Sequence, residues 1–90
     1  MHDIPRVTPK EFHHVRAELS NHGWTEHEIN RAEDLLHDSL VKNPHLSTWK
    51  PGIDREAAKM HIDYMRANKD SVHLGDHHID QLEAALYRHI

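Results

Sequence analysis

The chain has 90 residues, the size of one small domain, with 11 Lys and Arg against 15 Asp and Glu. It has no Cys, which excludes disulfides, thiolate metal sites and cysteine nucleophiles, and its basic residues are too scattered for nucleic-acid binding. No apolar stretch approaches the roughly 20 residues of a membrane span, and residues 1–10 lack the apolar core of a signal peptide, so we expect a cytoplasmic protein without membrane contact.

The first predicted helix covers residues 9–21. Thr8 is a helix-capping residue, Pro9 follows at the first helical position, and Glu11 completes a capping box. Gly23 marks the end of the helix, because glycine readily adopts the left-handed backbone that closes many helices. The apolar positions have helical spacing and are Phe12, Val15 and Leu19.

The second predicted helix covers residues 26–42 and begins with the same chemistry. Thr25 and Glu28 form another capping box, with Trp24 immediately before the cap in a position to pack against the helix. Pro44 ends the helix, because a residue that precedes proline avoids the helical backbone. The apolar positions are Ile29, Ala32, Leu35, Leu36 and Leu40.

Residues 43–52 form a long connection that contains two large apolar side chains, Leu46 and Trp49. One interpretation is that both fold back over the core as a lid. The other is that they are exposed anchors for a partner, because tryptophan is enriched among the residues that dominate protein interfaces.

Two further helices are predicted over about residues 55–68 and 76–90. Asp54 is the expected cap of the third helix, and Gly75 or Asp76 begins the fourth. The apolar positions of the third helix are Ala58, Ile62 and Met65, and those of the fourth are Ile79, Leu82, Ala85, Leu86 and Ile90.

These elements predict an all-α fold in which one domain, residues 1–90, contains two helical hairpins over about 8–42 and 53–90. The halves resemble a degenerate repeat. The second and fourth helices align at one offset, with Glu33 against Glu83, and the first and third helices align at a slightly shorter offset. A duplication explains this pattern, and so does the shared spacing of any two amphipathic hairpins.

Histidine is the one unusual component, with 12 residues. His22 and His27 flank the first predicted turn, and His73 and His77 flank the second. If the turns lie side by side, these imidazoles could bind Zn²⁺, Ni²⁺ or Cu²⁺. The alternatives are that histidine replaces other polar surface residues, or that its protonation makes the protein responsive to pH.

The sequence contains no nucleophile elbow, no phosphate-binding glycine loop and no zinc-protease motif, so we do not expect an enzyme. We expect a protein-interaction or regulatory module that binds a protein partner or self-associates and needs no cofactor. Trp49, Leu46 and Trp24 are the candidate anchors. Divalent metal binding at the turn histidines is the alternative function.

Overall fold

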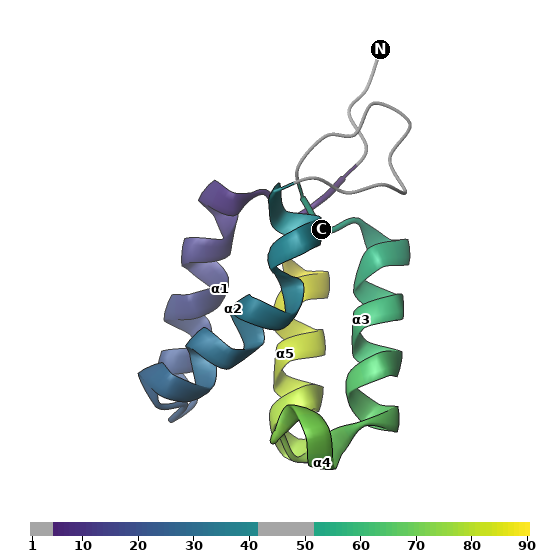
Figure 1. Ribbon diagram of the computed structural model, residues 1–90. Helices are drawn as coiled ribbons and strands as arrows, with labels where there is room; N and C mark the ends of the chain where they lie inside the picture. The colour runs from purple at the N-terminus through teal and green to yellow at the C-terminus, as the bar shows by residue number, and fades with distance from the viewer. Residues whose placement is uncertain (1–4, 42–51) are drawn as a thin grey trace.

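A computed structural model describes residues 5–41 and 52–90, and helices dominate both stretches (Figure 1). The described residues form no extended strand, so the predicted all-α fold is confirmed. The helices, in chain order, are α1 (Pro9–Asn21), α2 (Glu26–Val41), α3 (Arg55–Ala67), α4 (Lys69–Val72) and α5 (Asp76–Arg88).

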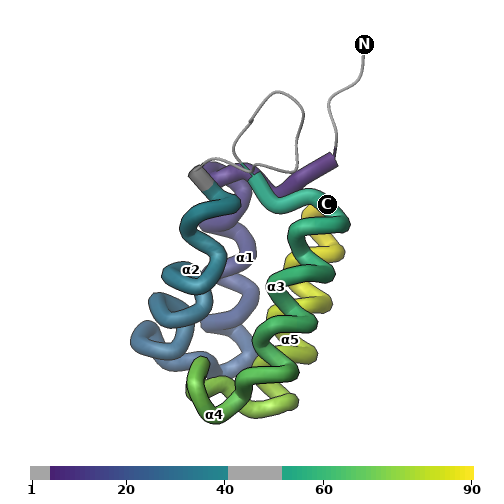
Figure 2. Tube along the Cα trace, turned by 45° about the vertical axis from the view of Figure 1, so that its right-hand side comes forward, coloured from purple at the N-terminus to yellow at the C-terminus, as the bar shows by residue number. Residues whose placement is uncertain are grey.

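The four longer helices form two antiparallel hairpins, α1–α2 and α3–α5, which stand side by side (Figures 1 and 2). Helix α1 also packs against α5, and α3 also packs against α2, so each hairpin contacts the other through both of its helices. The turns of the two hairpins lie at the same end of the bundle (Figure 2). Short helix α4 belongs to the second turn.

The helices begin where local capping chemistry predicts. Thr25 accepts a hydrogen bond from the backbone N–H of Glu28 (3.2 Å), and the Glu28 carboxylate accepts one from the N–H of Thr25 (2.9 Å). Asp54 accepts from the N–H of Ala57 (2.9 Å), and Thr8 caps α1 in the same way. These bonds satisfy N–H groups that have no partner inside the helix.

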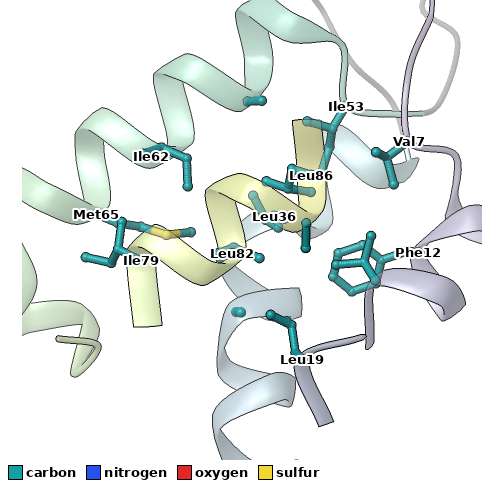
Figure 3. Close-up of a cluster of buried hydrophobic side chains, with 14 of the residues drawn as sticks. Val7, Phe12, Leu19, Leu36, Ile53, Ile62, Met65, Ile79, Leu82 and Leu86 are labelled. Carbon is teal, nitrogen blue, oxygen red and sulfur yellow. The ribbon is translucent and has the colours of Figure 1, made fainter. Parts of the chain in front are cut away.

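The core lies between the hairpins and contains the apolar stripes of all the longer helices (Figure 3). Burying each large aliphatic side chain there contributes about 1.5–3 kcal/mol. The large, fully buried residues of this core are Val7, Val15, Leu19, Leu36, Ile53, Ile62, Met65, Ile79, Leu82 and Leu86.

A short antiparallel bridge joins the beginnings of the two hairpins. The N–H of Val7 donates to the carbonyl of Ile53 (2.8 Å), and the N–H of Ile53 donates to the carbonyl of Val7 (2.9 Å). Both side chains are fully buried. The bridge therefore joins segments far apart in the chain, which the helical pattern does not predict.

The second turn differs from the prediction. Helix α3 ends at Ala67, within one residue of the predicted end, and the backbone of Asn68 lies outside the helical region (φ −129°). Helix α4 follows and places Val72 in the core, so burial holds the chain in an extra helical turn. Helix α5 ends at Arg88 instead of residue 90.

The two hairpins share details beyond their apolar spacing. Arg16 of α1 pairs with Glu33 of α2, and Arg66 of α3 pairs with Glu83 of α5 (3.2 Å), and in both cases the partners are 17 positions apart in the sequence. Each turn also contains one residue with a left-handed backbone, Gly23 (φ 91°) in the first and His73 (φ 58°) in the second. The predicted similarity of the halves thus extends to their ion pairs and turns.

Candidate functional site

The four histidines of the predicted metal site are all exposed at the turn end of the bundle. His22 lies at the end of α1 and His27 in the first turn of α2, whereas His73 and His77 flank Gly75. Within residues 5–41 and 52–90, no group of three or more His, Asp or Glu side chains is placed to hold one ion. Metal binding at these histidines stays a prediction.

A different histidine, His78, joins the two turns. Its Nε2 lies 2.8 Å from a carboxylate oxygen of Glu28, and its ring packs edge-on against the indole of Trp24 (4.8 Å between centroids). The backbone N–H of Thr25 is the main cause that lowers the pKa of Glu28, and His78 lowers it further. The Glu28 carboxylate therefore stays ionised more readily and is a negative partner for the His78 imidazole.

Trp24 is not the surface anchor that its residue type suggested. Its side chain is only 5% exposed, and its indole N–H donates to Gln81 on α5 (2.6 Å). The reason is its place immediately before the α2 cap, where an apolar side chain packs inward. The other two predicted anchors, Leu46 and Trp49, lie outside the described residues.

Three more polar contacts connect the hairpins away from His78. Glu18 of α1 pairs with Arg88 of α5 (2.7 Å) and lies 3.7 Å from the ring of His89. The hydroxyl of Ser39 on α2 lies 2.8 Å from Nε2 of His61 on α3. A serine beside a histidine resembles an activated nucleophile. However, Ser39 is only 6% exposed, so its hydroxyl is largely closed off from solvent.

Two hollows in the described surface were candidates for a ligand site. A groove of about 170 Å³ lies between α1 and α2, with Phe12 and Leu40 among its lining residues and His13 and His37 beside them. Pockets for small molecules usually measure about 300–1,000 Å³. A larger hollow of about 470 Å³ lies along α4 and is widely open to solvent. Neither has the form of a deep ligand site.

The outer side of α3 exposes large hydrophobic side chains to solvent. Met60 and Tyr64 are the large hydrophobic side chains exposed there, at 46% and 55%. They are one helical turn apart and therefore share a face. Lys59 and Asp63 form an ion pair beside them (2.8 Å), and this hydrogen bond raises the pKa of Lys59. We call these four residues the α3 face.

The α3 face was missed at the sequence level because a single Met and a single Tyr beside an apolar stripe look like the margin of the core. The neighbouring tyrosine, Tyr87, shows the contrast. It is half-buried, and the guanidinium of Arg55 lies over its ring (5.6 Å). Tyr64 instead presents its ring to solvent.

No protein-family model matches the chain, and comparisons with curated proteins and with solved structures likewise found no significant match. Among the described helices, none is both long enough and apolar enough to cross a bilayer.

Proposed function

We propose that this protein is a protein-interaction module that contacts its partner through the α3 face. The exposure of Met60 and Tyr64 on one side of a regular helix is the observation that supports this function. Apolar area removed from water contributes about 25 cal/mol per Å², so a partner that covers both side chains gains affinity from them. Methionine and tyrosine are also enriched at protein interfaces.

The rest of the bundle supports this use of α3. The opposite side of the helix is anchored in the core by Ala58, Ile62 and Met65. Asp54 fixes the start of the helix. The face is therefore presented on a rigid element, which lowers the conformational entropy lost when a partner binds.

Binding measured with a double variant tests the proposal. Met60→Gln combined with Tyr64→Gln removes the exposed apolar groups without adding charge, and Ala84→Gln on the exposed side of α5 is the matched control. Proteins captured by the immobilised native chain are identified by mass spectrometry, and the affinity of each is measured by calorimetry.

We expect the double variant to lose affinity for the partner, while the control keeps it. Circular dichroism must show equal helix content in all three proteins. Equal affinity of the double variant and the native chain would refute a role for the α3 face.

A further inference from the structure

We infer that the partner of the α3 face is a second copy of this chain, an inference that rests on the function proposed above. A contact between two identical chains around a two-fold axis uses the same patch twice, so that patch must be complementary to itself. The α3 face meets this requirement, because it carries one cation and one anion a turn apart beside two apolar side chains a turn apart.

In an antiparallel pairing of two α3 helices, the apolar row (Met60 and Tyr64) and the charged row (Lys59 and Asp63) can each contact the same row of the second copy. Around a two-fold axis between residues 60 and 64, Met60 of one copy lies against Tyr64 of the second copy, and the reverse contact forms as well. Sulfur beside an aromatic ring is a favourable contact. The pairing thus covers all four exposed apolar side chains of the two faces.

The charged row strengthens the same orientation. The two-fold operation places both charged rows on the same flank, so Lys59 of one copy meets Asp63 of the second copy twice. Within one chain these groups already pair, but their side chains are 73% and 60% exposed, so they remain accessible to a second copy. A parallel two-fold pairing would instead place the two charged rows on opposite flanks of the contact, so Lys59 of one copy would not meet Asp63 of the second copy.

The size of the face determines how strong the contact is. Specific stable interfaces bury more than about 1,000 Å² in total, and one face of a 13-residue helix offers less than that. We therefore expect a weak dimer whose population rises with protein concentration, not a permanent one.

Two charge-reversal variants test the pairing. Each is expected to lose self-association by itself, and a mixture of the two is expected to regain it. Lys59→Asp leaves two acids on the face, and Asp63→Lys leaves two bases, so each variant repels its own copy. We expect sedimentation equilibrium to show self-association weakened by about tenfold or more in each variant. Mixing the two variants should restore association, because their faces are complementary. Asp34→Lys, a charge reversal on the exposed side of α2, is the control and should dimerise like the native chain.

Three results would overturn the inference: a native chain that stays monomeric as its concentration rises, single variants that associate like the native chain, or a mixture that associates no better than its components. If the native chain does not self-associate but a different protein binds in a manner that depends on Met60 and Tyr64, the self-association inference fails while the proposed function stands. If neither contact depends on these residues, both fail.

Discussion

The left-handed residue in the second turn provides a sharp test of how the two hairpins are built. His73 has φ 58° and ψ 36°, a conformation that costs an L-residue roughly 1–2 kcal/mol. Its side chain is exposed, so replacing it does not remove core packing. His73→Gly removes that cost, but the more flexible unfolded chain offsets about 0.4–1 kcal/mol of the gain. We expect a net stabilisation of about 0.5–1 kcal/mol.

The first turn predicts the opposite effect. Gly23 has φ 91°, and a Cβ added there meets nothing within 4 Å, so Gly23→Ala changes only the backbone preference. We expect a loss of about 1 kcal/mol. Urea unfolding followed by circular dichroism measures both changes, and a 1 kcal/mol effect shifts the melting temperature by roughly 4–8 °C in a domain of this size.

His22→Gly is the control for loss of an exposed imidazole, because His22 has an ordinary backbone (φ −87°). Glycine there should be neutral or destabilising. If His73→Gly were no more stable than His22→Gly, the backbone argument would be wrong.

Three further predictions concern the core, the caps and the turn histidines. Leu36→Ala should destabilise the fold by about 2–5 kcal/mol in urea unfolding, because Leu36 is fully buried, and a loss below 1 kcal/mol would contradict the described core. The pKa of Glu28 is lowered chiefly by the N–H of Thr25, so its stabilising effect is present above its unfolded pKa and is lost as the pH falls through its folded pKa. Melting temperatures between pH 3 and 6 should therefore fall less steeply toward acid in Glu28→Gln than in the native chain, and identical slopes would count against this. Zn²⁺ titration should give weak binding at several sites without a rise in melting temperature, since no described cluster can hold one ion; tight binding of one equivalent with clear stabilisation would favour the metal site.

The helices were predictable because the information that begins and ends them is local. Thr8, Thr25 and Asp54 hydrogen-bond to N–H groups three residues away, so a short stretch of sequence contains both partners. The core could be predicted for the same reason, since each helix repeats its apolar residues at the helical period.

The remaining features depend on contacts between segments that are distant in the sequence. Helix α4 is held by the burial of Val72 in the core, and the residues next to Val72 in the sequence do not indicate that it is buried. His78 meets Glu28 only after two hairpins pack. The exposure of Met60 and Tyr64 likewise reflects which side of α3 the rest of the bundle leaves uncovered. Periodicity identifies the stripe that a helix buries, but it does not say where the covered area stops.

The Arg16–Glu33 and Arg66–Glu83 pairs have a consequence for the order in which the protein assembles. Each pair joins the two helices of one hairpin. The chain between the partners is short, so little conformational entropy is lost when the pair forms. The Val7–Ile53 bridge must instead close a loop that contains an entire hairpin. On this basis we expect the two halves to acquire their shape early and separately and to dock in a late step. Substitutions at Val7 should then act chiefly by accelerating unfolding, whereas weakening either arginine pair should slow folding.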